Sequence, residues 1–236
     1  MSTVADTAVV ADRIGQNLAR IRERIAEASA KAGRNPDAIT IVAVSKTVDR
    51  TTIDAAYHAG LRVFGENRVQ DAIAKLDPAL PPDASMHLIG QLQSNKAKAA
   101  VQHFDLIESV DRPSLIAALA SASQPRDRIV PVLLQVNIAG ETQKAGCAPA
   151  DAPALIESIL AAPNLSLIGL MTIAPLVDDV EEVRPVFSGL RDLRDRLRIK
   201  YSGLDLPVLS MGMSNDFEIA VEEGATHVRI GRALFS

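Results

Sequence analysis

The chain has 236 residues, of which 47% are hydrophobic and 23% are charged. This balance is typical of a globular protein with a sizeable core, and the length suits one large α/β domain. A net charge of −4 and an aromatic content of 3% disfavour nucleic-acid binding, because the chain offers neither an excess of basic residues nor many stacking platforms.

The N-terminus and the cysteine content bear on the compartment. Cys147 is the only cysteine, so no disulfide can form within the chain. The first residues, MSTVADTAVVADRIGQ, lack a basic region followed by a long apolar run, so they resemble neither a signal peptide nor a membrane span. We therefore expect a cytoplasmic protein with no membrane partner. Residues 1–12 are expected to be a flexible N-terminus of a single domain that spans 1–236.

The first predicted element is a helix that ends near Gly33. Its apolar side chains recur at spacings of three and four residues, which is the pattern of an amphipathic helix. They are Ile14, Leu18, Ile21 and Ile25.

After this helix, short apolar runs alternate with segments of helical pattern. The runs are 39–45, 61–64, 86–89, 106–110, 130–136, 167–173, 208–211 and 227–230. Such alternation predicts right-handed βαβ units and a parallel sheet. Eight repeats favour closure into a single (β/α)₈ TIM barrel with an extra N-terminal helix, rather than an open sheet.

The longest of the later helical segments lies near 179–201. Its apolar residues form one stripe, which predicts a helix that packs on the barrel. They are Val183, Phe187, Leu190, Leu193 and Leu197.

Barrel enzymes carry their functional groups where the strands run into the following loops. In this chain nearly all residues at these positions are polar or glycine. They are Ser45, Lys46, Thr47, Gly65, Glu66, Asn67, Arg68, Gly90, Gln91, Gln93, Ser94, Asn95, Lys96, Ser109, Asp111, Asn137, Thr172, Gly212, Ser214, Asn215, Gly231 and Arg232.

Lys46 directly follows the first apolar run. A lysine that enters a barrel mouth is partly desolvated, and desolvation favours the neutral amine. A neutral amine attacks a carbonyl and forms a Schiff base with a carbonyl substrate or with pyridoxal phosphate. The alternative is a surface lysine with a solvated head.

The seventh and eighth units, LSMGMSNDFE and VRIGRALF, each read strand, glycine and helix start. In many barrels these two loops bind phosphate through backbone N–H groups and a helix N-terminus. The alternative is a pair of tight turns without a ligand.

Arg229 lies inside the last apolar run, between Val228 and Ile230, which point the other way. An arginine directed into the barrel needs a partner. Glu66 or Asp111 would make it a buried ion pair, and the ring nitrogen of a ligand would make it a binding residue. An arginine keeps such a nitrogen unprotonated, because a guanidinium does not release its proton.

The ordered motifs then identify a family resemblance. They are VAVSKT, FGENRVQDA, HLIGQLQSNK, SVD, LLQVNIAGETQKAG, GLMTIAP and LSMGMSNDFEIAVEEGATHVRIGRALF. With these stretches the chain resembles the pyridoxal phosphate homeostasis proteins of the YggS/PROSC type, from about Ile41 to the C-terminus.

The resemblance implies a barrel similar to the N-terminal domain of alanine racemase, with pyridoxal 5′-phosphate held as a Schiff base on Lys46. It places the phosphate on Ser214, Gly231 and the backbone at Arg232. Many members carry threonine at the position of Arg232, and histidine or proline at that of Gln91. Position 232 therefore offers no side-chain hydroxyl to the phosphate here.

The resemblance also implies that Arg229 faces the ring nitrogen and that Asn67 and Met213 line the cofactor. Lys144, in the GETQKAG loop, matches a family lysine proposed to take part in cofactor transfer; an exposed loop lysine is the alternative.

We expect a carrier that supplies the cofactor to apo-enzymes without turnover, as a monomer or weak dimer. The alternative is a racemase or decarboxylase, which needs placed proton donors and acceptors and an electron sink. In alanine racemase-type enzymes a further β-domain supplies a tyrosine base, and here Tyr57 and Tyr201 fall on or near outer helices. A sugar-phosphate aldolase that uses Lys46 is a third possibility.

Overall fold

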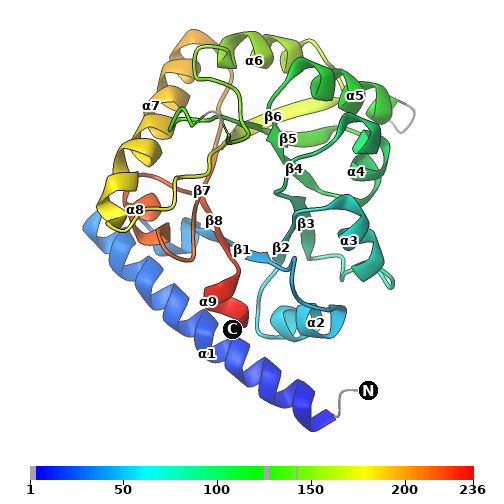
Figure 1. Ribbon diagram of the computed structural model, residues 1–236, viewed down its shortest axis with the longest axis vertical. Helices are drawn as coiled ribbons and strands as arrows, with labels where there is room; N and C mark the ends of the chain where they lie inside the picture. The colour runs from blue at the N-terminus through cyan, green and yellow to red at the C-terminus, as the bar shows by residue number, and fades with distance from the viewer. Residues whose placement is uncertain (1–3, 125–127, 142) are drawn as a thin grey trace.

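The computed structural model describes residues 4–124, 128–141 and 143–236, with side chains described from residue 9 onward. In this part of the chain eight parallel strands close into a barrel in sequence order (Figure 1). They are β1 (Thr40–Val44), β2 (Val63–Glu66), β3 (Ser85–Leu88), β4 (Leu106–Val110), β5 (Val130–Gln135), β6 (Leu165–Met171), β7 (Val208–Met213) and β8 (His227–Ile230). The ring closes where β8 pairs with β1, with His227 opposite Thr40. The predicted barrel is confirmed.

Helices surround the barrel and connect its strands (Figure 1). They are α1 (Val4–Lys31), α2 (Arg50–His58), α3 (Val69–Lys75), α4 (Ala97–His103), α5 (Pro113–Ser123), α6 (Ala152–Leu160), α7 (Arg184–Lys200), α8 (Phe217–Glu222) and α9 (Arg232–Phe235), with the short 3₁₀ helices η1 (Pro36–Ala38), η2 (Ser94–Lys96) and η4 (Val180–Val183). In the described residues, no helix combines the length and apolar character needed to cross a membrane.

The extra N-terminal helix, α1, lies across the outside of the barrel against α2, α8 and α9 (Figure 1). All four apolar residues predicted for its inner face are buried. The helix begins at Val4, and Val10 and Ala11 pack against the core, so the described part of segment 1–12 is helical; its expected flexibility stays a prediction. Gly33, at a φ of 64°, follows its last turn.

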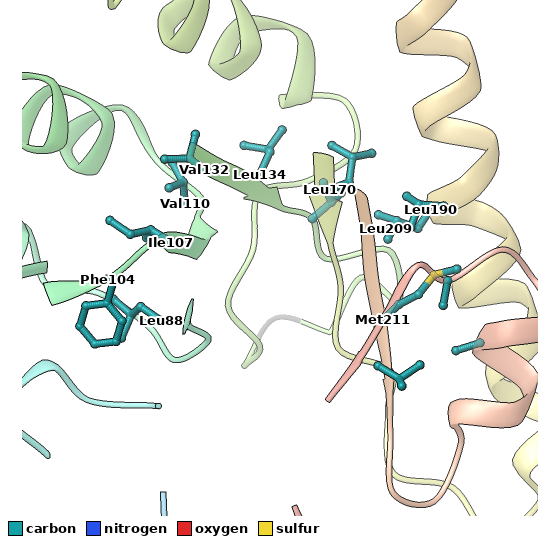
Figure 2. Packing of buried hydrophobic residues seen from close by; sticks show 14 of the residues in the cluster. Leu88, Phe104, Ile107, Val110, Val132, Leu134, Leu170, Leu190, Leu209 and Met211 are labelled. Atoms are coloured by element: carbon teal, nitrogen blue, oxygen red, sulfur yellow. The ribbon is translucent and has the colours of Figure 1, made fainter. Parts of the chain in front are cut away.

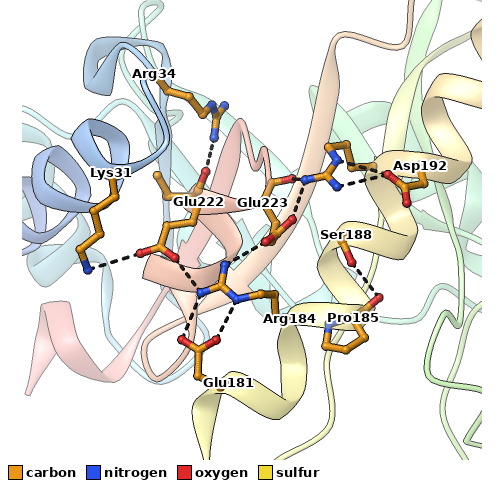
Figure 3. Close-up of polar contacts among 11 residues, drawn as sticks. Lys31, Arg34, Glu181, Arg184, Pro185, Ser188, Asp192, Glu222 and Glu223 are labelled. Atoms are coloured by element: carbon orange, nitrogen blue, oxygen red, sulfur yellow. Dashed lines mark hydrogen bonds and ion pairs between the residues drawn. The ribbon is translucent and has the colours of Figure 1, made fainter.

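A charged cluster ties α1 to α7 and α8 (Figure 3). Arg184, the first residue of α7, contacts Glu181, Glu222 and Glu223. Glu222 also pairs with Lys31 at the end of α1, with 3.4 Å between Nζ and Oε1. The hydrogen bonds that Arg184 donates to the three carboxylates raise its pKa, so this guanidinium keeps its charge.

The main core lies between the outer face of the barrel and the helices. Figure 2 shows part of it, with Leu190 of α7 beside Leu209 of β7 and with Phe104 beside Leu88. The predicted stripe of the 179–201 segment is confirmed, because all five of its apolar side chains are buried. Burial of such side chains contributes about 1.5–3 kcal/mol each to stability.

The interior of the barrel is partly apolar and partly polar. One apolar patch is formed by Val42, Val44 and Ile89, with Val63 against them. A second is formed by Leu106, Leu133, Met171 and Val208. Buried polar side chains lie on β3, β4, β7 and β8, among them His87, Glu108, Ser210 and Arg229.

Candidate functional site

The predicted site residues lie at one end of the barrel, because the carboxyl ends of parallel strands meet at the same rim. They follow or end the strands β7, β8, β1 and β2, which are consecutive around the ring. The residues are Lys46, Asn67, Met213, Ser214, Gly231 and Arg232, with Arg229 inside β8. The structure therefore brings these residues to one side of the mouth.

Lys46 follows the end of β1 by two residues and is exposed. Val42 and Val44 face the barrel interior, and the two-residue period of a strand continues toward Lys46. No described residue makes a hydrogen bond or ion pair with its amine. The predicted desolvation by the protein is wrong for this structure, because the rim around Lys46 is open to solvent.

A buried polar cluster fixes the backbone just before Lys46. The carbonyl of Ser45 accepts a hydrogen bond from Lys75 Nζ at 2.8 Å, and the Ser45 hydroxyl donates to Glu66 Oε1 at 2.6 Å. Lys75 also pairs with the same carboxylate oxygen at 2.8 Å. Glu66 is fully buried at the end of β2, so it belongs to the strand rather than to the loop where the sequence placed it.

Asn67 is half-buried, and its backbone packs directly on Gly90 in the next loop. A Cβ at position 90 would lie 2.2 Å from the carbonyl oxygen of Asn67, so this contact requires glycine. Gly65, in β2, packs closely on the side chain of Val42, because a Cβ at position 65 would lie 2.9 Å from Val42 Cγ1. Two glycines thus bring the loops after β2 and β3 together above an apolar floor.

The turns after β7 and β8 lie side by side. Ser214 Oγ accepts a hydrogen bond from the backbone N–H of Ala233 in α9 at 3.4 Å. Gly212, at a φ of 93°, bends the end of β7 so tightly that a Cβ there would lie 2.6 Å from Ala220 Cβ. Met213 ends β7 with an exposed side chain, and its N–H donates to Asp216 Oδ1 at 2.5 Å.

Gly231 and Arg232 adjoin the first strand. A Cβ at Gly231 would lie 3.4 Å from Val44 Cβ, so this turn borders the strand that leads to Lys46. The N–H of Arg232 precedes the first intrahelical hydrogen bond of α9 and is available to an acceptor, whereas that of Ala233 donates to Ser214 Oγ. The side chain of Arg232 is exposed.

Arg229 is directed into the barrel, with 4% of its surface exposed. It donates to Ser210 Oγ and to the carbonyl oxygen of Thr172, each at 2.7 Å. The two acidic partners considered from the sequence are wrong: Glu66 pairs with a lysine, and Asp111 pairs with the neighbouring arginine. Among the described residues, partners are found for two of its five N–H groups, so it retains donors for a ligand.

A polar network below Arg229 was missed by the sequence reasoning. The hydroxyl of Ser210 donates to Glu108 Oε2 at 2.5 Å, and His87 Nδ1 lies 2.8 Å from Glu108 Oε1. Burial opposes ionisation of Glu108, but the hydrogen bond and charge of His87, with Arg229 and Ser210, lower its pKa overall. The ring of His227 stacks on that of His87, with 6.1 Å between the ring centroids.

Burial lowers the pKa of Arg229, against the opposing charges of Glu108 and Asp216. Burial also lowers the pKa of His227 to about 4, so this ring is neutral near pH 7. The sequence signal for the network was a charged residue in an otherwise apolar strand, since a buried charge requires a partner.

Lys144 lies in the loop after β5, which is four strands from β1 around the ring. Its amine pairs with Glu141 Oε1 at 2.7 Å, and a quarter of its side chain is exposed. Cys147 ends the same loop, and burial raises the pKa of its thiol to about 12. The structure therefore places Lys144 across the mouth from Lys46, and the thiol remains protonated.

Two hollows lie away from this rim. One of about 680 Å³ lies between α1 and the starts of β1 and β2, and its lining includes Arg22, Thr40 and Val63. The other, of about 550 Å³, lies at the end of α7 beside Arg198 and Leu204. Neither contains a predicted site residue, so size alone does not mark the functional site.

Comparison with known proteins gives consistent relatives. Residues 16–236 match the family described as the alanine racemase N-terminal domain. A protein of Aquifex aeolicus named pyridoxal phosphate homeostasis protein is 43% identical over 220 residues, which are 93% of this chain and 96% of that protein. A protein of the same name from Pseudomonas aeruginosa is 43% identical over 222 residues, 94% of each.

Solved structures of PipY from Synechococcus elongatus share the fold. The structure without PLP has a TM-score of 0.85 at 40% identity, and that with PLP bound has a TM-score of 0.82 at 39% identity. Each comparison covers 94% of this chain and 100% of the other.

Proposed function

The chain belongs to the alanine racemase N-terminal domain family and, within it, to the pyridoxal phosphate homeostasis proteins, and from this we propose that it binds pyridoxal 5′-phosphate as a Schiff base on Lys46. In this proposal it keeps the cofactor available to apo-enzymes and turns over no substrate of its own. The observation that carries the proposal is an amine at the rim with no partner among the described residues, one strand away from the joined turns of β7 and β8.

The residues present fit the chemistry of this cofactor. When bound, pyridoxal phosphate supplies an aldehyde that condenses with a primary amine. Lys46 offers such an amine, and no described side chain competes for it. Arg229 retains unused N–H donors inside the barrel, and the adjoining turns offer backbone N–H groups suited to a phosphate.

Each site residue then has a specific role in this proposal. Ser214, Gly231 and the backbone at Arg232 bind the phosphate, and Arg229 donates to the ring nitrogen. Asn67 and Met213 flank the cofactor. Support comes from the placement of these six residues and Lys46 on or directly after four consecutive strands, and from the glycine contact that fixes the backbone of Asn67.

Two observations favour a carrier over a racemase or decarboxylase. Acid–base chemistry at an amino-acid Cα needs placed proton donors and acceptors. The hydroxyls of Tyr57 and Tyr201 instead bind Asp83 and Glu157, on the outside of the barrel. An arginine at the ring nitrogen also weakens the electron sink, because it leaves that nitrogen unprotonated.

Visible absorbance tests the binding proposal. Protein mixed with pyridoxal phosphate is expected to show the visible band of a Schiff base, and borohydride is expected to remove it. Lys46→Ala should lose the band, whereas Lys144→Ala, a change at another rim lysine, should keep it. A wild-type protein that stays colourless with the cofactor would overturn the proposal.

Proton exchange separates the carrier from the enzyme. Loaded protein is incubated with single amino acids in deuterated water, and exchange at Cα is followed by NMR. The carrier predicts no exchange beyond that of free pyridoxal phosphate. Rapid exchange with turnover would instead establish a racemase or decarboxylase.

A further inference from the structure

A directed line of hydrogen bonds runs beneath the mouth of the barrel. A guanidinium only donates, and an ionised carboxylate only accepts. The Ser210 hydroxyl has a single proton, so it donates this proton to Glu108 and accepts from Arg229. His87 Nδ1–H donates to the other oxygen of Glu108, so both carboxylate oxygens are occupied.

Glu108 and Arg229 are a charge pair separated by a hydroxyl. Glu108 is fully buried and Arg229 nearly so, and each needs the other's charge because isolated charges are costly in a barrel interior. Asp216 also acts on Arg229, but its carboxylate accepts the N–H of Met213. Glu108 is therefore the carboxylate that is linked to Arg229 by hydrogen bonds.

The intervening Ser210 changes what Arg229 offers to a ligand. A direct Arg–carboxylate pair is usually bidentate and uses two N–H groups on one partner. Here Ser210 accepts one hydrogen bond, and Glu108 supplies the opposite charge at one remove. The positive charge of Arg229 is thus offset by Glu108, while three of its N–H groups have no partner in the described residues.

We propose that Glu108 is a positioning residue for the cofactor: through Ser210 it orients Arg229 and offsets its charge, so that the free N–H groups face the pyridine nitrogen. This inference rests on the proposed function, in which Arg229 binds the ring. His87 completes the arrangement, because its hydrogen bond fixes the carboxylate plane.

The test compares charge and position in separate variants. Glu108→Gln keeps the shape and removes the charge, whereas Ser210→Ala keeps both charges and breaks the link. Glu222→Gln, at an ion-paired glutamate on the outside of α8, is the control. For each variant we would measure the dissociation constant for pyridoxal phosphate and the pH at which the visible band of the bound cofactor is lost.

Glu108→Gln is expected to weaken binding about tenfold, the effect of a change of about 1.4 kcal/mol. It should also lower the pH at which the band is lost, because removing a negative charge disfavours nearby protonated groups. A shift of about one pH unit corresponds to one charge acting over roughly 10 Å at an effective dielectric of about 20. Ser210→Ala is expected to weaken binding with a smaller pH shift, and the control is expected to change neither.

The outcomes distinguish this inference from the proposed function. A wild-type protein without the visible band contradicts the proposed function itself. A wild-type band with unchanged affinity and pH profile in Glu108→Gln contradicts only the positioning role. If Glu108→Gln does not fold, Ser210→Ala decides: unchanged cofactor affinity in that variant overturns the inference.

Discussion

Gly90 offers a direct test of how the rim holds Asn67. In Gly90→Ala the new Cβ would lie 2.2 Å from the carbonyl oxygen of Asn67 and 2.7 Å from its Cα. Carbon–oxygen contacts are ordinarily no shorter than about 3.3 Å, so one loop must move by about 1 Å. Overpacking of this kind costs about 1–3 kcal/mol in the free energy of unfolding.

The same movement displaces a proposed cofactor contact. We therefore expect Gly90→Ala to lower the affinity for pyridoxal phosphate about tenfold, an effect of about 1.4 kcal/mol. Urea unfolding of the cofactor-free protein measures the first effect, and titration with the cofactor measures the second.

Gly15→Ala is the matched control. Gly15 lies in α1, and a Cβ there would meet no heavy atom within 4 Å. Since alanine favours a helix over glycine by about 0.5–1 kcal/mol, this variant should be more stable and should bind as the wild type does. If Gly90→Ala matched Gly15→Ala in both assays, the inferred contact between the two loops would be refuted.

Three further predictions concern stability. Because burial lowers the pKa of His227 from 6.5 to about 4, its contribution is full above pH 6.5 and is lost as pH falls toward 4. This loss reaches about 3 kcal/mol of the free energy of unfolding. Urea unfolding across that pH window should therefore show a weaker pH dependence in His227→Gln than in the wild type. His103→Gln, at an exposed histidine, should keep the pH dependence of the wild type. Phe187→Ala should cost about 3–5 kcal/mol in the same assay, since the ring is fully buried, and a cost below 1 kcal/mol would contradict its place in the core. Arg184→Met should cost about 1 kcal/mol or less, and the loss should shrink in high salt, because its ion pairs are partly exposed.

The barrel was predictable because each strand carries its own apolar pattern. The second strand, predicted at 61–64, runs instead over Val63–Glu66. The prediction ended before Gly65 and Glu66 because glycine and glutamate are typical of loops. Gly65 lies in the strand because Val42 and Ile89 leave no room for a side chain, and Glu66 because Ser45 and Lys75 both bind its Oε1. These contacts are made with residues distant in the sequence, so the local sequence pattern does not reveal them.

The rim residues were predictable from their positions after the strands, but the interior network was not. Arg229 was recognised as buried, yet its link to Glu108 depends on register across the barrel, from β8 through β7 to β4. The sequence did contain a signal, because Glu108 interrupts an apolar run. The exposure of Lys46 was likewise not predictable, because it depends on how the loops around the rim pack in three dimensions.

Identifying the covalently labelled residue tests the central claim most directly. The protein is loaded with pyridoxal phosphate, reduced with borohydride and digested, and the labelled peptide is sequenced by mass spectrometry. The proposed function predicts one dominant label, on Lys46, in stoichiometric amount. A dominant label on Lys75 or Lys144, or no label above that of an unrelated protein, would contradict it.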